Sequence, residues 1–431
     1  SYKRYDTSFY LVWRFFINFC FTSNGNNTSS HKGYPGGDWK KVVWEDKDIT
    51  LMVMNNIDKR IVVLSAGGTA GHVFPAAALL KELETRGLEV KIITDSRGSN
   101  WADILNISTN FQIQASGFFG KGVFSKVVGL LKTLFGMFQT ILIIWRLKPA
   151  LVVGFGGYAS IPAILVASFR SIPTVIHEQN SVLGRANRFV AKRVDKIATS
   201  YQNVRFLEKT IENKVVFTGM PVRSLVEELR STEYPVILDS SSLKILIFGG
   251  SQGANIFSRV LPQSLDRLDV RLRSRIEVIH QCRVEDTDTL VSNYRELGIK
   301  FEVSEFFSDL PEKIAQSNLV ITRAGSSTLA EITIIGRPAV IVPYPFAVDD
   351  HQTTNAKEFE SAGGGWLFSN RSFTPKLCAG LLKEVLFDPV ILEKKAMSSK
   401  NMGQVGAVSR LADLSLGLIS KSSPVERGVA K

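Results

Sequence analysis

The stretch Asn318–Ala356, NLVITRAGSSTLAEITIIGRPAVIVPYPFAVDDHQTTNA, contains one complete strand–loop–helix–strand unit. It opens with the short β-branched run Leu319–Thr322, which is typical of a buried parallel strand. A turn of small residues follows, and the pattern predicts a helix from Thr328 to Gly336 and a second strand over 339–342. Because open α/β sheets bind ligands at the carboxyl ends of their strands, the unit predicts a binding edge.

Glu331 has two interpretations within this unit. It lies three residues after Thr328, the spacing of a capping box, in which its carboxylate would serve only the helix N-terminus. Alternatively, the carboxylate accepts both hydroxyls of a nucleotide ribose, while the helix N-terminus faces a diphosphate. The loop after the second strand adds further polar residues at this edge, namely Asp349, Asp350, His351, Gln352 and Asn355.

The composition is that of a globular protein with an anionic partner. A chain of 431 residues predicts about two to three domains, and 45% hydrophobic with 21% charged residues excludes a disordered chain. Cys20, Cys282 and Cys378 match no metal or redox spacing, which indicates a reducing compartment. The net charge of +12 favours an anionic partner without distinguishing nucleic acid, membrane and phosphate.

A long interval without acidic residues separates Asp103 from Glu178. Within it, 118–145 is rich in Phe, Leu, Ile and Val, but its longest uncharged part, Thr133–Trp145, has only 13 residues. A membrane-spanning helix needs about 20, so we predict either an element that lies on anionic lipid or an ordinary core helix. The basic residues of the interval are Lys121, Lys126, Lys132, Arg146, Lys148 and Arg170.

Residues 1–58 differ from the rest of the chain. An apolar run over 11–21 is interrupted by Arg14, and the polar segment 23–37 has the composition of a loop or disordered chain. We predict no signal peptide, because a small-residue cleavage site is lacking. We expect the working protein to begin near Met52 or Met54, just before the first clear strand.

The rest of the chain contains the same pattern twice. A strand over 61–64 leads into a glycine loop at 67–72 and a helix at 75–86, and a strand over 244–248 leads into a second glycine loop at 249–254. Glycine lets the backbone approach a phosphate, and a following helix N-terminus supplies free amides. The repeat predicts an α/β fold of two Rossmann-like domains that face each other across a cleft.

We place these domains at 59–223 and 224–403, and expect a final helix at 404–420 to pack back on the first. Seven motifs, in order, resemble the bacterial lipid-I N-acetylglucosaminyltransferases of peptidoglycan synthesis, the MurG family of GT-B glycosyltransferases. The resemblance covers residues 60 to about 420. The motifs are GGTAGHVFPA from Gly67, GFGGYASIP from Gly154, HEQN from His177, GMPVR from Gly219, GGSQGA from Gly249, RAGSSTLAE from Arg323 and DHQTTNA from Asp350. One departure is Ala70, where the family commonly has Gly.

The resemblance implies an inverting transfer of GlcNAc from UDP-GlcNAc to the 4-hydroxyl of MurNAc in undecaprenyl-pyrophosphoryl-MurNAc-pentapeptide. This reaction converts lipid I to lipid II at the cytoplasmic face of the bacterial inner membrane, where the enzyme is peripheral. The implied partners are UDP-GlcNAc, lipid I and an anionic membrane surface, with no cofactor, no metal and no nucleic acid.

The resemblance also implies roles for individual residues. Ser251 with Ser326–Thr328 would face the diphosphate, the Phe307 backbone the uracil, Glu331 the ribose and Gln352 the sugar hydroxyls. Asn180, Arg223 and residues 69–71 would reach the donor from the other side of the cleft. The implied substrate-binding residues are Thr69, Ala70, Gly71, Asn180, Arg223, Ser251, Phe307, Ser326, Ser327, Thr328, Leu329, Ala330, Glu331 and Gln352.

The reaction needs a base that takes the proton from the acceptor hydroxyl. His72, in a glycine loop at the predicted cleft, is one candidate, although it could also be a core imidazole; Glu178 and Asp349 are the rivals. We expect helix dipole and amides to meet the charge of the leaving UDP. The DxD sequence Asp286–Asp288 of metal-dependent transferases occurs here, but it precedes a predicted helix, which favours capping.

The sequence leaves two other functions open. One is a glycolipid synthase of the same fold that uses a UDP-sugar, and the other is a non-catalytic protein that binds a nucleotide-sugar or NAD. The second would require degraded positions on the catalytic side, whereas His72, Glu178 and Gln352 are all present. Nucleic-acid binding is not favoured, because the basic interval is apolar and lacks clustered Lys and Arg.

Overall fold

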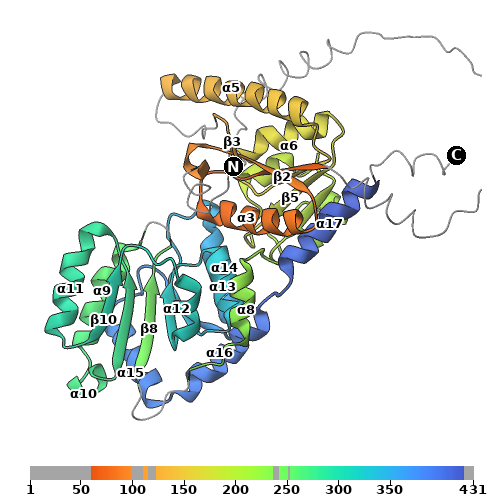
Figure 1. The fold of residues 1–431 in the computed structure, drawn as a ribbon. Coiled ribbons are helices and arrows are strands. Elements are labelled where there is room, and N and C mark those ends of the chain that lie inside the picture. The colour runs from red at the N-terminus through yellow and green to blue at the C-terminus, as the bar shows by residue number, and fades with distance from the viewer. Residues whose placement is uncertain (1–59, 100–109, 115–122, 236–241, 251–252, 422–431) are drawn as a thin grey trace, which may run out of the picture. The chain divides into compact units, whose positions relative to one another are not determined.

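Two parallel β-sheets, one after the other along the chain, form the framework of the protein in its computed structural model (Figure 1). The structure describes residues 60–99, 110–114, 123–235, 242–250 and 253–421, which belong to one unit, Asn55–Lys431. The expectations for residues 1–58, and the diphosphate role of Ser251, lie outside the described residues. The predicted α/β fold is confirmed, with helices packed around each sheet.

The first sheet has the strand order β3-β2-β1-β4-β5-β6-β7 and is parallel throughout its described strands. Strand β4 is completely buried, as a β-branched strand covered on both faces should be. The strands are β1 Ile61–Ser65, β2 Glu89–Thr94, β3 Asn110–Gln112, β4 Leu151–Gly154, β5 Thr174–Glu178, β6 Lys196–Thr199 and β7 Val215–Phe217.

The second sheet has the order β10-β9-β8-β11-β12-β13 and is also parallel. The predicted strands are present as β11 and β12, and both are buried. The boundary at residue 223 lies between β7 and β8 and stays a prediction. The strands are β8 Leu243–Phe248, β9 Ile276–Gln281, β10 Lys300–Ser304, β11 Leu319–Thr322, β12 Ala339–Ile341 and β13 Gly365–Leu367.

Each sheet has a point where the strand order reverses, between β1 and β4 in the first and between β8 and β11 in the second. Ligands bind at such switch points, beyond the carboxyl ends of the strands. The loops that leave these four strands are the glycine loops after β1 and β8 and the loops that begin at Phe155 and Arg323. The topology therefore brings four of the predicted motifs to two switch points.

Helices cover the faces of both sheets (Figure 1). The α-helices are α3 Ala70–Thr85, α5 Val123–Leu147, α6 Ser160–Phe169, α7 Arg185–Val190, α8 Ser224–Glu228, α9 Asn255–Asp266, α10 Val270–Arg273, α11 Thr287–Glu296, α12 Leu310–Gln316, α13 Ser326–Ile335, α14 His351–Ser361, α15 Pro375–Phe387, α16 Val390–Met402 and α17 Ala407–Lys421. Short 3₁₀ helices are η1 Lys209–Lys214, η2 Leu229–Ser231, η3 Val284–Asp286 and η4 Val348–Asp350.

Two predicted helix starts were wrong. Helix α3 begins at Ala70 rather than at Pro75, so that Pro75 lies inside the helix and cannot donate to the carbonyl of Gly71. Helix α13 begins at Ser326 rather than Thr328, because the extended Gly325 takes the N-cap position. No side chain caps α13, so Glu331 is not part of a capping box. Residues 70–74 therefore belong to α3, and residues 326–327 belong to α13, rather than to the loops before these helices.

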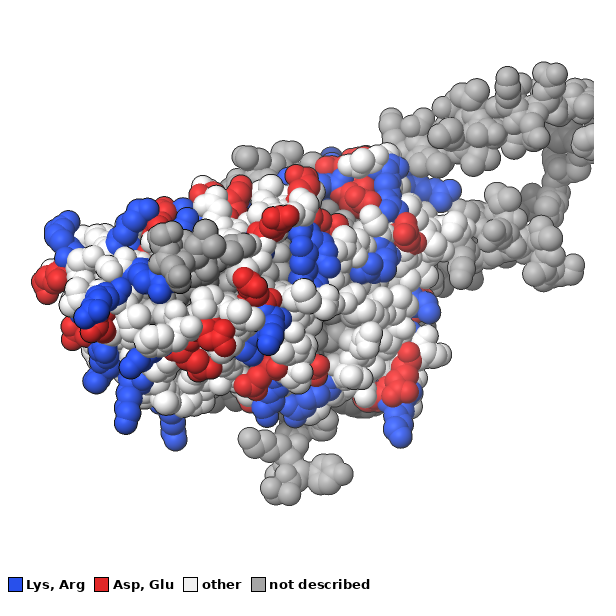
Figure 2. Space-filling model, turned by 90° about the horizontal axis from the view of Figure 1, so that it is seen from below, with Lys and Arg blue, Asp and Glu red and all other residues white. Residues whose placement is uncertain are grey.

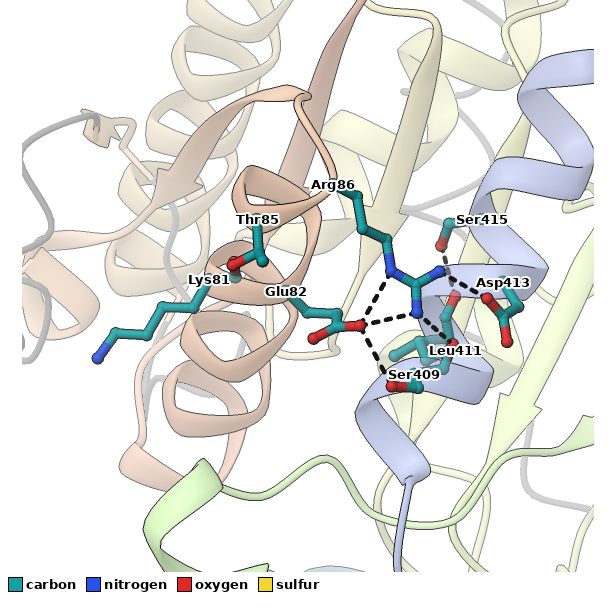
Figure 3. Close-up of polar contacts among 8 residues, drawn as sticks. All are labelled: Lys81, Glu82, Thr85, Arg86, Ser409, Leu411, Asp413 and Ser415. Atoms are coloured by element: carbon teal, nitrogen blue, oxygen red, sulfur yellow. Dashed lines mark hydrogen bonds and ion pairs between the residues drawn. The ribbon is translucent and has the colours of Figure 1, made fainter.

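Helix α17 crosses back from the second half of the chain and packs beside α3, as predicted, although it begins at Ala407 (Figure 1). Its apolar face enters the core of the first half through Leu411, Ala412 and Ile419. The polar edge of this contact is held by Arg86, the C-cap residue of α3. Figure 3 shows the Arg86 guanidinium between the carboxylates of Glu82 and Asp413, and it also reaches a carbonyl oxygen of α17.

We predict that Arg86→Leu loosens α17. The guanidinium donates 2.9 Å and 2.7 Å bonds to Glu82 and spans to Asp413, so its loss should lower the free energy of unfolding by about 1 kcal/mol. Hydrogen exchange should speed up in α17 before it does in the strands. The exposed neighbour Glu84, changed to Gln, is the control and should leave exchange unaltered. Unchanged α17 protection in Arg86→Leu would show that apolar packing alone holds the helix.

Candidate functional site

A cavity of about 1130 Å³ lies between the carboxyl edges of the two sheets and is lined by both halves of the chain. Ligand pockets for a single small molecule measure roughly 300–1,000 Å³, so this cavity has room for a nucleotide-sugar and part of an acceptor. Most of the predicted site residues line it: Thr69, Ala70, Gly71, His72, Glu178, Asn180, Arg223, Phe307, Ser326, Ser327, Thr328, Glu331, Asp349 and Gln352. The prediction from separate motifs therefore converges on one cavity.

His72 lies in the first turn of α3, half-buried at the cavity wall. Its Nδ1 is 2.8 Å from the carbonyl oxygen of Gly67 and 3.0 Å from the hydroxyl of Thr69. A carbonyl only accepts, so Nδ1 carries the proton and Nε2 has the free lone pair. A Cβ on Gly156 would lie only 3.3 Å from Nε2, so glycine there keeps this edge of the imidazole open. Burial lowers the pKa of His72.

Glu178 ends β5, and its carboxylate is almost completely buried. One oxygen accepts from the backbone and side-chain nitrogens of Asn180, at 3.0 and 3.3 Å, and the other accepts from Gly184 and Asn187, both at 2.8 Å. Burial raises its pKa, although these donors act in the opposite direction. A carboxylate bonded in this way fixes the loop between β5 and α7.

Asp349 reaches across the cavity to helix α7 of the other half. Its carboxylate accepts a 2.8 Å bond from Arg185 and a short bond from Arg188. The hydrogen bond from Arg185 is the main reason that the pKa of Asp349 is lowered. Such a carboxylate is a weak base. Asp349 and Asp350 both have positive φ, so this turn is strained, and Asp349 lines the cavity.

Glu331 forms an ion pair with Arg223, with 3.0 Å between the guanidinium and the carboxylate oxygen. Burial raises the pKa of Glu331, and the positive charge of Arg223 opposes this shift. Arg223 also lies over the ring of Phe74 at 5.7 Å, and its Nε is buried with no partner among the described residues. The carboxylate is therefore a cavity group with one charged partner and is not a helix cap.

The N-terminus of α13 presents hydroxyls and amides to the cavity. Ser326 donates a short bond to the backbone oxygen of Gln179, and the buried hydroxyl of Ser327 lacks a partner among the described residues. Thr328 lines the cavity as well. Leu329 and Ala330 do not: Leu329 is buried in the core, and Ala330 packs against that core. These two predicted binding residues are not brought to the site, because the helix turns them inward.

The remaining predicted residues surround these groups. Phe307 is buried beneath Lys313, whose ammonium lies 4.8 Å from the ring. Gln352 accepts a 2.8 Å bond from the backbone nitrogen of Tyr344, which orients its amide. Asn180 follows β5 and is held by Glu178.

The sequence prediction missed the arginines of α7 and the role of Asn355. Arg185 and Arg188 lie three residues apart, where an arginine pair on a short helix could have indicated a surface for acidic groups. Asn355 is fully buried in α14 and is bonded to Ser181 of the first half and Ala324 of the second. No local signal in the sequence marks an asparagine as buried.

In the described part of the chain, no three His, Cys, Asp or Glu side chains are grouped to hold a metal ion. The DxD sequence lies apart from the cavity lining. Asp286 occupies the N-cap position of α11, but it makes no side-chain cap bond and instead accepts from Asn255 at 3.3 Å. The predicted capping bond is therefore absent at Asp286.

Comparison with known proteins agrees with this geometry. Residues 62–199 match the glycosyltransferase family 28 N-terminal domain, and residues 244–411 match the corresponding C-terminal domain. A solved structure of Acinetobacter baumannii MurG aligns with a TM-score of 0.68 at 30% identity, covering 83% of this chain and 99% of that one. A putative UDP-N-acetylglucosamine 2-epimerase of Listeria monocytogenes, with a TM-score of 0.60 at 14% identity, shares the fold alone.

Curated relatives are closer in sequence. UDP-N-acetylglucosamine--N-acetylmuramyl-(pentapeptide) pyrophosphoryl-undecaprenol N-acetylglucosamine transferase of Paramagnetospirillum magneticum is 46% identical over 85% of this chain and 98% of its own length. The protein of the same name from Rhodospirillum rubrum is 43% identical over 82% and 90%. The resemblance inferred from the motifs is confirmed: the chain belongs to glycosyltransferase family 28, within the MurG group of N-acetylglucosamine transferases.

Proposed function

We propose that this protein transfers GlcNAc from UDP-GlcNAc to the 4-hydroxyl of MurNAc in lipid I and thereby forms lipid II. The observation that carries the proposal is one cavity that combines the imidazole of His72, the N-terminus of α13 with the unpartnered hydroxyl of Ser327, and the buried carboxylate of Glu331. The relatives of 40–46% identity bear the name of this reaction. Radiolabel from UDP-GlcNAc should pass to a lipid I analogue and not to diacylglycerol, which would be the acceptor of a glycolipid synthase.

His72 is the base that the geometry favours. The acceptor oxygen attacks the anomeric carbon, its proton passes to Nε2 of His72, and the bond between that carbon and the diphosphate breaks as UDP leaves. The carboxylate of Glu178 already accepts four hydrogen bonds, and that of Asp349 accepts bonds from two arginines. Neither carboxylate is therefore as available to accept a proton as Nε2 of His72. The amides and dipole at the start of α13 stabilise the charge on UDP.

We predict that His72→Ala lowers kcat by about 10²-fold or more, the scale of general base catalysis, and leaves UDP affinity unchanged. Because burial depresses the pKa of His72 below its ordinary value of 6.5, the imidazole is neutral at pH 7. The wild-type kcat should therefore fall only when the pH drops below 6.5. This acid limb should disappear from the residual activity of the variant. Near-normal turnover in His72→Ala, with loss in Glu178→Gln or Asp349→Asn, would move the base to that residue.

Glu331 is the proposed ribose-binding group. Its side chain is 15% exposed at the cavity, on the helix whose N-terminus would face the diphosphate. A carboxylate can accept from two neighbouring hydroxyls at once. Binding of the nucleotide would thus add two neutral donors beside the existing charged donor, Arg223.

We predict that Glu331→Gln weakens UDP binding by about tenfold or more, since hydrogen bonds to a charged acceptor contribute about 1.5–3 kcal/mol. The same substitution should cost less affinity for 2′-deoxy-UDP, because one of the two hydroxyls is already missing. Calorimetric titration of both ligands, with the exposed Glu384→Gln as control, measures this difference. Equal losses for UDP and 2′-deoxy-UDP would refute the contact with the 2′-hydroxyl.

Helix α5 supports the proposed membrane partner. Ile144 is fully buried in the core with Met137 and Ile141 packed against it, while a second apolar row is exposed. This row, spaced three, four and three residues apart, is Phe135, Phe138, Leu142 and Trp145, with exposed fractions of 55, 54, 50 and 62%. The spacing places the row on one face of the helix.

The surroundings of this row also fit an anionic lipid surface. Arg146 and Lys148, at the end of α5, are exposed, and the predicted Lys121, Lys126 and Lys132 have side chains outside the described residues. Among the described residues, no helix is long and apolar enough to cross a membrane. Figure 2 views the molecule from the side away from α5, and on that face basic and acidic side chains are interspersed rather than gathered by sign. An interfacial helix with aromatic residues beside basic ones binds lipid in two ways: its apolar side chains are buried in the bilayer, and its basic side chains are attracted to anionic headgroups.

We predict that replacing Phe138 and Trp145 together by Glu lowers binding to phosphatidylglycerol vesicles by about tenfold or more, because each inserted aromatic side chain contributes about 1.5–3 kcal/mol when fully buried. UDP affinity should persist. Phe387, 67% exposed on α15, provides the matched control, and Phe387→Glu should leave vesicle binding unaltered. Equal co-sedimentation of the double variant and wild type would show that the row does not insert.

A further inference from the structure

A buried asparagine connects two loops, one from each half of the chain, that line the cavity. Asn355 lies in α14 and is fully buried. Its Oδ1 accepts from the backbone nitrogen and the hydroxyl of Ser181, at 3.0 and 2.8 Å. Its Nδ2 donates to Oδ1 of Asn180 at 3.1 Å and to the carbonyl of Ala324 at 3.2 Å. All four hydrogen-bonding positions of the amide are thus used.

The partners of Asn355 belong to the two loops on which the reaction depends. Asn180 and Ser181 follow β5 in the first half, in the loop that Glu178 fixes. Ala324 precedes Gly325, the N-cap of α13 in the second half. The hydroxyl of Ser326 also donates to the backbone oxygen of Gln179. Residues 179–181 are therefore bonded to 324–326 both directly and through Asn355.

This contact differs from the ion pairs between the halves. The ion pairs of Asp349 with Arg185 and of Glu331 with Arg223 have partly exposed arginines, at 51 and 35%. Long exposed side chains can follow a shift of one half against the other, and water can replace their bonds. A buried amide with four hydrogen bonds cannot follow such a shift, because any displacement leaves buried donors or acceptors without partners.

We infer that Asn355 is a positioning residue, which sets the register between the half that carries His72 and the half that carries the N-terminus of α13. It does not touch the reacting atoms; its four bonds keep the base and the donor at reacting distance. The inference rests on the transfer reaction proposed above. A displacement of about 1 Å between reacting groups can lower a reaction rate by about 10²-fold. A small shift between the two halves should therefore lower kcat strongly.

The first test compares Asn355→Ala with Asn355→Asp. Alanine removes all four bonds, whereas aspartate keeps the acceptor for Ser181 and loses the two donated bonds. Both variants should lose about 10²-fold in kcat with UDP-GlcNAc and a lipid I analogue, on the scale of misplaced reacting groups. Their UDP dissociation constants should change far less than kcat, because the proposed uracil, ribose and diphosphate contacts belong to the second half. The acid limb of the pH profile should also stay in place, since His72 is intact.

Ser181→Ala removes only the hydroxyl bond and should give a smaller loss of kcat. It also keeps the inference testable if neither Asn355 variant folds. Asn401, exposed at the end of α16, offers the matched control, and Asn401→Ala should behave as wild type. A folded Asn355→Ala enzyme with normal kcat would overturn the inference.

A second measurement does not depend on the reaction. Spin labels at Glu84→Cys on α3 and Lys376→Cys on α15, both exposed positions, report the distance between the halves in a Cys20→Ser background. The distance distribution should broaden in Asn355→Ala and Asn355→Asp but not in Asn401→Ala. If kcat and UDP affinity fall together with an unchanged distribution, Asn355 only stabilises the fold, and the inference is wrong. If wild type fails to use lipid I, the distance measurement still decides the register role.

Discussion

A buried polar group needs hydrogen-bond partners, and this requirement determines how the loops between the two halves are arranged. Glu178 is almost completely buried and has four donors, which hold together the loop from Asn180 to Asn187. Asn355 is buried against that loop and ties it to the start of α13. Hydrogen bonds among buried polar groups thus fix the loops of the cavity wall, and the apolar sheets bring these loops close to each other.

The same requirement is met differently at Arg337, which is fully buried without a carboxylate partner in the described part of the chain. Its guanidinium donates to the carbonyl oxygens of Ala315, Ile335, Gly336 and Glu233. Three of these carbonyls lie at or near the ends of α12 and α13, where the helix dipole is negative. Burial lowers the pKa of Arg337 to about 10, so the group stays charged at neutral pH. The far end of α13 is therefore anchored by a cation, which leaves its N-terminus oriented toward the cavity.

The framework could be predicted from the sequence because strands and glycine loops have local signals. The β-branched run Leu319–Thr322 is a strand by composition, and the repeated glycine loops mark the two switch points. The starts of α3 and α13 could not be predicted in the same way. Pro75 normally marks a helix start but lies inside α3, and Gly325 competes with Thr328 for the cap of α13. Which residue becomes the helix start depends on tertiary contacts, and the local sequence does not show these contacts.

The sequence alone does not distinguish the three candidate bases. His72, Glu178 and Asp349 all carry a proton-accepting group at the cavity, and their motifs give them equal standing. Their pKa values are shifted by different causes: burial lowers that of His72, burial raises that of Glu178, and the hydrogen bond from Arg185 lowers that of Asp349. A raised carboxyl pKa alone would favour Glu178, but its lone pairs are already used by four donors. A carboxylate whose lone pairs are all occupied is poorly placed to accept a proton, and this is why we propose His72 as the base.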